Sequence, residues 1–232
     1  MAQLSLTWLG HSSFVMTTPG GVTVVFDPWY TGNPSFPQGR EPKAADLVLV
    51  SHGHSDHITD AAAVAASTGA TVVGMWEVVS WLGTKGVSRV EPMNKGGSIH
   101  THGLRLSMVE AVHSSSIDEN GLVGLGDAAG FMVTVEDGRT LYFAGDTALF
   151  GDMKLLGELY RPEVACLPIG DRFTMGPEHA AMAARWLGAR HVVPMHYGTF
   201  PLLTGTPEAL QQHLAGSGVT MHACQPGGTL TF

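Results

Sequence analysis

The sequence is poor in cysteine and in charged residues. Only two cysteines, Cys166 and Cys224, occur in 232 residues, too few for the disulfide framework of a small secreted domain. Charged residues make up 14% of the chain, and 12 Lys and Arg against 20 Asp and Glu give a net charge of −8. A surface that binds nucleic acid needs a basic face, so we expect no nucleic acid among the partners.

Long hydrophobic runs are also missing. No segment reaches the roughly 20 apolar residues that a membrane helix requires. The N-terminal MAQLSLTWLG lacks the basic start and the apolar stretch of a signal peptide. We therefore expect a cytoplasmic protein without a membrane span. Because 44% of the residues are hydrophobic, the chain can fill one sizeable core, which predicts a single domain over residues 1–232.

The pattern of apolar runs and turn residues predicts a mixed α/β fold. Pro19-Gly20-Gly21 and Asp137-Gly138 have the composition of hairpin turns, and helical segments alternate with strands in the last third. A long proline-rich loop covers residues 28–42. The expected strands cover residues 4–10, 13–19, 20–28, 46–52, 71–75, 103–113, 164–170 and 191–198, the expected hairpins 130–146 and 219–232, and the expected helices 60–67, 151–160, 177–188 and 207–218.

Several of the expected strands end at a histidine or an aspartate. These residues are Asp27, His52, His113, Asp146 and His196. Strand ends from distant parts of a chain can meet on one rim, where loops on a rigid scaffold host function. With 12 histidines, as many as Lys and Arg together, the chain is rich in the commonest metal-binding side chain.

The strongest local signal is the segment Ser51-His-Gly-His-Ser-Asp-His57. Four metal-binding side chains fall within six residues, and Gly53 allows the backbone to bend sharply between them. His52 and His54 can face one ion, and Asp56 and His57 a second one. Clustered histidines repel one another when they are protonated, so a group of histidines and aspartates at a strand end needs a reason to stay together. A polar loop without function is therefore the weaker alternative. A single tetrahedral ion does not require so many donors, which favours two ions.

These motifs resemble the metallo-β-lactamase superfamily, whose His-x-His-x-Asp-His signature residues 52–57 match. Within the superfamily, the chain is similar to the branch that contains ascorbate-6-phosphate lactonase and N-acylphosphatidylethanolamine phospholipase D, and most of all to the small metal-dependent hydrolases of that branch. The segments that carry this narrower likeness are WLGHSSF at 8–14, AGDT at 144–147, LPIGDRFTMGPEHA at 167–180 and PMHYGTFP at 194–201. The resemblance implies an αββα sandwich of four layers, in which two mixed β-sheets are flanked by helices.

The resemblance also implies a role for each matching residue. His52, His54 and His113 would hold one metal ion; Asp56, His57 and His196 would hold the other; and Asp146 would bridge the two. The expected cofactor is a pair of divalent ions, with zinc favoured and manganese the alternative, because imidazole suits first-row metals and carboxylates accept harder ions. A hydroxide bridging the two ions would cleave a small ester, lactone or phosphodiester, with Asp56 and Asp146 as the catalytic carboxylates.

Five further residues are candidates for contacts with the substrate or for support of the metal ligands. Asp27 is expected to orient a metal-binding histidine. His11 has a site role or a structural hydrogen bond in its turn, and His179 either binds substrate at the start of a helix or is structural. Asp171 and Arg172 contact substrate or form a buried ion pair.

Two functions therefore follow from the sequence. The first is a dinuclear hydrolase acting on a small molecule. The second is a protein that has kept its metals but serves as a non-catalytic binding or regulatory module. All seven ligands that the resemblance implies are present, which favours the hydrolase. Related proteins assemble into oligomers, so we expect a homo-oligomer. The loop that holds Trp29, Tyr30, Phe36 and Pro37 is expected to cover the active-site cleft with apolar surface or to pack against a neighbouring subunit.

Overall fold

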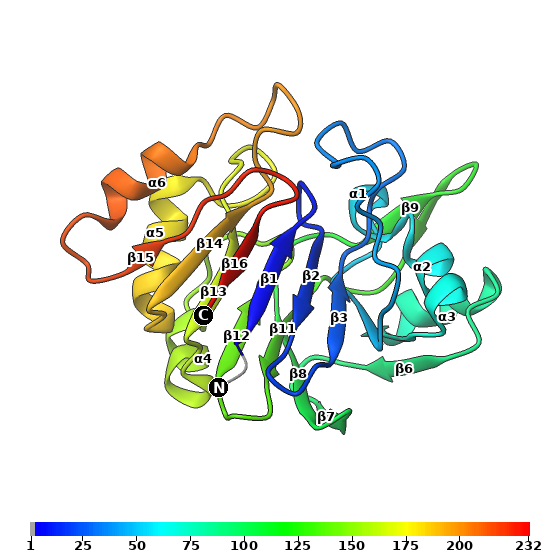
Figure 1. Ribbon diagram of the computed structural model, residues 1–232. Coiled ribbons are helices and arrows are strands. Elements are labelled where there is room, and N and C mark those ends of the chain that lie inside the picture. Colours follow the sequence, from blue (N-terminus) through cyan, green and yellow to red (C-terminus); the bar gives the residue numbers. More distant parts are fainter. Residues whose placement is uncertain (1–2) are drawn as a thin grey trace.

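The computed structural model describes residues 3–232. Two seven-stranded sheets form the centre of the protein (Figure 1). The first sheet has the order β16-β1-β2-β3-β4-β5-β6 and the second β15-β14-β13-β12-β11-β8-β7. In the first sheet the strands are β1 (Ser5–Trp8), β2 (Phe14–Thr17), β3 (Thr23–Phe26), β4 (Leu47–Val50), β5 (Thr71–Met75), β6 (Val90–Met93) and β16 (Thr229–Thr231).

The second sheet is built from the middle and the last part of the chain. Its strands are β7 (Ser98–Thr101), β8 (Leu104–Glu110), β11 (Ala129–Thr134), β12 (Thr140–Phe143), β13 (Val164–Pro168), β14 (His191–Met195) and β15 (Thr220–Met221). A separate hairpin of β9 (Ser116–Asp118) and β10 (Leu122–Gly124) stands outside both sheets.

The two sheets pack face to face through aromatic side chains. The Phe143 ring on β12 lies 4.7 Å from the Phe26 ring and 6.3 Å from the Phe14 ring, measured between ring centroids. All three side chains are fully buried. Strands such as β4 and β13 are buried along their whole length, as expected for parallel strands that are covered on both faces.

Helices cover the outer faces of the sandwich, which completes the four layers (Figure 1). α2 (Ala61–Thr68) and α3 (Trp76–Thr84) contact strands of the first sheet. α5 (Pro177–Leu187) and α6 (Pro207–Leu214) contact strands of the second sheet, and α4 (Met153–Tyr160) packs on α5. α1 (Ser55–Ile58) is a single turn after β4. The expected αββα sandwich is thus confirmed. Within residues 3–232, no helix has the length and apolar character needed to cross a membrane.

The predicted hairpin over residues 219–232 is wrong. β15 pairs in parallel with β14 in the second sheet, whereas β16 pairs antiparallel with β1 in the first. The Pro226-Gly227 turn therefore carries the chain from one sheet to the other. Turn residues indicate that the chain changes direction, but they do not indicate which sheet edge it then joins. The hairpin turns at Pro19-Gly20-Gly21 and Asp137-Gly138 connect β2 to β3 and β11 to β12, as predicted.

The sheet topology brings the chemically interesting strand ends together. β3 and β4 run in parallel, so that Asp27 and His52 leave the same edge of the first sheet. β8 is antiparallel to β11, which is antiparallel to β12, and β12, β13 and β14 are parallel. The carboxyl ends of β8, β12 and β14, which precede His113, Asp146 and His196, therefore share one edge of the second sheet.

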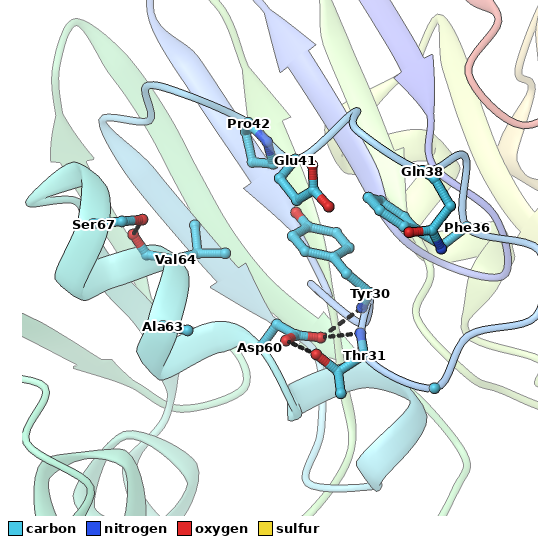
Figure 2. Close-up of a pocket in the computed structure, with 11 residues that line it drawn as sticks. Tyr30, Thr31, Phe36, Gln38, Glu41, Pro42, Asp60, Ala63, Val64 and Ser67 are labelled. Carbon is cyan, nitrogen blue, oxygen red and sulfur yellow. Dashed lines mark hydrogen bonds between the residues drawn. The ribbon is translucent and has the colours of Figure 1, made fainter.

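The loop between β3 and β4 is tied to the start of α2. The Asp60 carboxylate accepts hydrogen bonds from the backbone N–H groups of Tyr30 and Thr31 and from the Thr31 hydroxyl (Figure 2). Trp29, Tyr30 and Phe36 are 7%, 9% and 6% exposed. Although largely buried, Tyr30 and Phe36 line a cavity of about 520 Å³ beside Asp60 and Val64 (Figure 2). The expectation that this loop covers the active-site cleft or packs against a neighbouring subunit stays a prediction.

Candidate metal centre

Histidine nitrogens from the loop after β4 and from the segment after β8 converge on one point. The His52 Nε2 atom lies 3.0 Å from His54 Nδ1, which lies 3.3 Å from His113 Nε2. The Ser51 hydroxyl donates its proton to Asp27 at 2.6 Å and therefore accepts from His52 Nδ1 at 2.9 Å. The proton of His52 is thus on Nδ1, and its Nε2 lone pair faces the other two imidazoles. A cation between the three nitrogens would accept a lone pair from each of these imidazoles.

A second group of donors lies beside the first. Ligand atoms of His11, Asp56, His57 and His196 all lie within 4.8 Å of one another. Asp56 and His57 come from the single turn of α1, whereas His196 directly follows β14. These four residues thus come from three distant parts of the sequence.

Asp146 stands between the two groups. Its Oδ2 atom lies 3.4 Å from His57 Nε2, 2.9 Å from His196 Nε2 and 3.6 Å from His113 Nε2. Its Oδ1 atom is buried and has no hydrogen-bond partner among the described residues, and the same holds for His57 Nε2. Buried polar atoms without partners are costly, and cations bound between the donors would satisfy both of them. The residues present therefore fit a metal centre.

The charges at the site depend on these neighbours. Burial raises the pKa of Asp146, but His196 and His57 outweigh that effect and hold it well below its usual range. Burial lowers the pKa of His57, but Asp146 and Asp56 outweigh it and raise it well above the usual value. Burial also keeps the pKa of His52 well below its usual value. A cation at His57 would take the place of the proton that the metal-free ring carries.

Asp27 lies behind His57 and is fully buried. Its Oδ2 atom accepts from His57 Nδ1 at 2.7 Å and from the Ser51 hydroxyl, while Oδ1 accepts from the Ser51 N–H at 2.7 Å. Both oxygens are thus engaged with protein donors, and the His57 ring is turned so that Nε2 points to Asp146. Burial raises the pKa of Asp27.

Three residues of the site have left-handed backbone conformations. The φ angles are 55° at His11, 40° at Asp27 and 54° at His196. Such angles are uncommon outside glycine, and they cluster at functional sites, where the surrounding structure holds them. The neighbouring Gly145 has a φ of 59°, and a Cβ atom there would lie 2.7 Å from the Ser51 Cβ atom. Glycine therefore lets the two sheet edges approach each other next to Asp146.

The remaining candidates lie apart from this cluster. Asp171, Arg172 and His179 are exposed, so the alternative of a buried ion pair between Asp171 and Arg172 is wrong. Arg172 instead lies over the Phe173 ring at 5.6 Å. Asp171 and His179 line a separate cavity of about 350 Å³ at the start of α5. None of the three belongs to a group of converging ligand atoms among residues 3–232.

Two supporting residues were not identified from the sequence. Ser51 connects Asp27 to His52, and the Thr199 hydroxyl lies 2.9 Å from His11 Nδ1. Both are close in sequence to a metal-binding candidate, Ser51 to His52 and Thr199 to His196. Proximity to those histidines is a weak signal, because serine and threonine are common in loops of every kind.

Comparison with known proteins identifies the family. The model of the β-lactamase superfamily domain matches residues 5–196, a range that contains every member of both donor groups. A UPF0173 metal-dependent hydrolase of Solibacter usitatus is 46% identical over 225 residues, covering 97% of this chain and 98% of the relative. Another from Rubrobacter xylanophilus is 47% identical over 230 residues, covering 97% and 95%.

A solved structure agrees with the sequence relatives. Igni18, described as a novel metallo hydrolase of the archaeon Ignicoccus hospitalis, superposes with a TM-score of 0.89 at 36% identity, covering 99% of this chain and 98% of that one. The matches span nearly the whole chain in both comparisons, and they agree with the donor groups that the geometry reveals. The chain therefore belongs to the β-lactamase superfamily and, within it, to a group of metal-dependent hydrolases.

Proposed function

We propose that the protein is a dinuclear hydrolase, formed by one domain, that cleaves a small ester, lactone or phosphodiester. One observation carries the proposal: two groups of converging donors share Asp146 between them. In this proposal His52, His54 and His113 hold one ion, Asp56, His57 and His196 hold the other, and the Asp146 carboxylate contacts both. A pair of divalent ions, when bound, supplies activated water at neutral pH and polarises the oxygen of the scissile group.

The chain's own residues prepare the site for that chemistry. Asp27 fixes the tautomer and the orientation of the His57 ring, and Ser51 does the same for His52. The carboxylates of Asp146, which is buried, and of Asp56, which is 26% exposed, would offset the charge of the cations. The nitrogen-rich donor set favours zinc, whereas the two carboxylates keep manganese as the alternative.

The proposal is tested by a panel of substrates. We expect zinc- or manganese-loaded protein to hydrolyse at least one of three probe classes: aryl esters, small lactones and aryl phosphodiesters. Chelation of the metal and the variant His54→Ala should each abolish that turnover. Exposed His100, which lies on β7, gives a matched control in His100→Ala, and its activity should equal that of the wild type.

The outcome also separates the two functions that the sequence leaves open. Two tightly bound ions together with no turnover in any class would overturn the hydrolase and favour a non-catalytic binding or regulatory module. Protein that binds no divalent ion would contradict both. The homo-oligomer and the cytoplasmic location stay expectations of this proposal, and sedimentation of the purified protein tests the first of them.

The substitution Asp27→Asn replaces the anionic acceptor of His57 Nδ1 with a neutral amide. Its NH₂ group cannot accept from the donors that the second oxygen of Asp27 holds, so the His57 ring is oriented less firmly. We expect the affinity for the ion at His57 to fall by about 10–100-fold, the usual cost of losing such a supporting contact. A competition titration with a chromophoric chelator measures this.

The matched control is Asp46→Asn. Asp46 accepts a hydrogen bond from the Thr23 N–H at the opposite end of β3 and β4, away from the donors. Its metal affinity should match that of the wild type. Equal affinities for Asp27→Asn and the wild type would show that Asp27 does not orient a metal ligand.

A further inference from the structure

His11 is completely enclosed at the edge of the donor cluster. Its side chain has an exposed fraction of 0%. The ring centroid lies 3.9 Å from that of His196, 5.1 Å from Trp29 and 5.7 Å from Phe200. A side chain that is covered in this way has no free edge to present to a substrate. The geometry therefore argues against a direct contact between His11 and substrate.

The backbone of His11 also connects distant elements. Its carbonyl group accepts hydrogen bonds from the Trp8 indole at 2.9 Å and from the His196 N–H at 3.0 Å. The turn after β1 and the end of β14 are thereby held together at one residue. The ring position is consequently fixed from both sides, which makes its hydrogen bonds well defined.

Each ring nitrogen of His11 has a single side-chain partner. Nε2 lies 3.1 Å from Asp56 Oδ2, and Nδ1 lies 2.9 Å from the Thr199 hydroxyl. A carboxylate can only accept hydrogen bonds, so the contact with Asp56 is favourable when Nε2 carries the proton. Nδ1 then has a lone pair, and the Thr199 hydroxyl donates to it at 2.9 Å in preference to the Tyr197 carbonyl oxygen, which lies farther away at 3.4 Å.

A different assignment makes His11 a metal ligand. Its ligand atom belongs to the group that also contains Asp56, His57 and His196. A nitrogen that coordinates a cation carries no proton, so coordination through Nε2 would require the proton on Nδ1. The position of the single ring proton of His11 therefore distinguishes the two roles: a proton on Nε2 fits the hydrogen bond to Asp56, and a proton on Nδ1 fits a metal ligand. His11 is also the only side chain in residues 3–232 that hydrogen-bonds the Asp56 carboxylate, which is 26% exposed and would lose this donor if Nε2 turned to a metal.

We propose that His11 is a positioning residue and that Thr199 sets its tautomer. The Nε2–H group holds Asp56 Oδ2, which leaves Oδ1 of that carboxylate free to face the ion shared with His57 and His196. Thr199 lies three residues after His196, so the same contact couples the loop after β14 to α1. The part that concerns the ion rests on the proposed function, whereas the tautomer is a property of the chain itself.

Nitrogen NMR of the histidine rings tests the tautomer directly. We expect long-range ¹H–¹⁵N spectra of ¹⁵N-histidine-labelled protein to place the His11 proton on Nε2, both in metal-free and in zinc-loaded protein. The assignment comes from the signal that His11→Gln removes. A proton on Nδ1 with zinc on Nε2 would overturn the proposal, and so would a ring that is protonated on both nitrogens at neutral pH.

Variants of Thr199 test the link to the metal site. Thr199→Val keeps the shape but removes the donor, and we expect the affinity for the more weakly bound ion to fall by about tenfold. Thr199→Ser restores the hydroxyl and should stay within about twofold of the wild type. Thr84→Val, in which the lost hydroxyl donates to the Trp81 carbonyl in α3, is the matched control and should leave the affinity unchanged.

The two levels of the proposal fail in different ways. An unchanged zinc affinity in folded Thr199→Val would overturn the role of Thr199. Lack of turnover in the substrate panel would contradict the proposed function but would leave the tautomer and the zinc titrations as measured. Circular dichroism of each variant verifies that it is folded, so that a loss of affinity is not a loss of structure.

Discussion

Replacing Asp146 with asparagine should empty both metal positions of the protein. The Oδ2 atom of Asp146 approaches Nε2 atoms of His57, His113 and His196, so this carboxylate serves both donor groups. The asparagine side chain would have no negative charge, and its NH₂ group cannot coordinate a cation. We expect fewer than one ion per chain after dialysis and at least about a 100-fold loss of turnover, more than the usual effect of a supporting residue. Elemental analysis and the substrate panel measure the two effects.

The control for this substitution is Asp152→Asn. Asp152 is exposed and stands before α4, where its side chain makes no capping hydrogen bond. The control substitution removes the same charge without touching the site, so metal content and turnover should match the wild type. A protein with Asp146→Asn that keeps one full ion and loses only the other would show that Asp146 serves one position and is not shared.

Gly170→Ala should be among the most destabilising changes of one methyl group in this protein. An added Cβ atom would lie 2.1 Å from the carbonyl oxygen of His196. That atom belongs to the backbone next to the ligand cluster, so the clash cannot be relieved by rotating a side chain. We expect a loss of about 3 kcal/mol in the free energy of unfolding, at the upper end of overpacking effects. For a chain of this length, this lowers Tm by roughly 6–12 °C.

A second glycine shows whether the clash or the residue type is responsible. Gly83 is exposed in α3, and a Cβ atom there would meet nothing within 4 Å. Because alanine is the better helix former, Gly83→Ala should raise the stability by up to about 1 kcal/mol. Calorimetry of both variants measures the difference. Equal melting temperatures for Gly170→Ala and the wild type would mean that the loop after β13 moves freely away from His196.

The cluster of candidate metal donors was predictable because its signal is local and chemically unusual. His52, His54, Asp56 and His57 fall within six residues, and so dense a group of metal-binding side chains rarely serves any purpose besides binding a cation. The more isolated candidate donors follow from a pattern in the strands: an apolar run ends at a histidine or an aspartate, as before His113, Asp146 and His196. Parallel strands bring such ends to one edge of their sheet. The meeting of the two edges depends in addition on how the two sheets pack.

Other features depend on contacts that a linear pattern does not encode. β15 and β16 have the sequence pattern of a hairpin, but each joins the edge of a different sheet. Asp171, Arg172 and His179 lie in loops and at a helix start, where polar residues are common, and the structure leaves them exposed. The sequence pattern did not predict α3, although Val78, Val79 and Leu82 are buried at helical spacing; its amphipathic pattern is short and interrupted by polar residues.

Thr199 shows the same limit at the site itself. The sequence places it near His196, but its partner is the His11 ring, 188 residues away. That contact exists only because the turn after β1 and the end of β14 meet, which requires both sheets to be in place. Residues that support a site from behind are consequently harder to predict than candidate metal donors, whose side-chain chemistry is recognisable in the sequence.

Anomalous diffraction from crystals grown with zinc tests the central claim most directly. We expect two zinc peaks per chain, one bounded by His52, His54 and His113 and the other by Asp56, His57 and His196, with the Asp146 carboxylate in contact with both. A single peak, or zinc bound elsewhere on the chain while these donors stay metal-free, would contradict it.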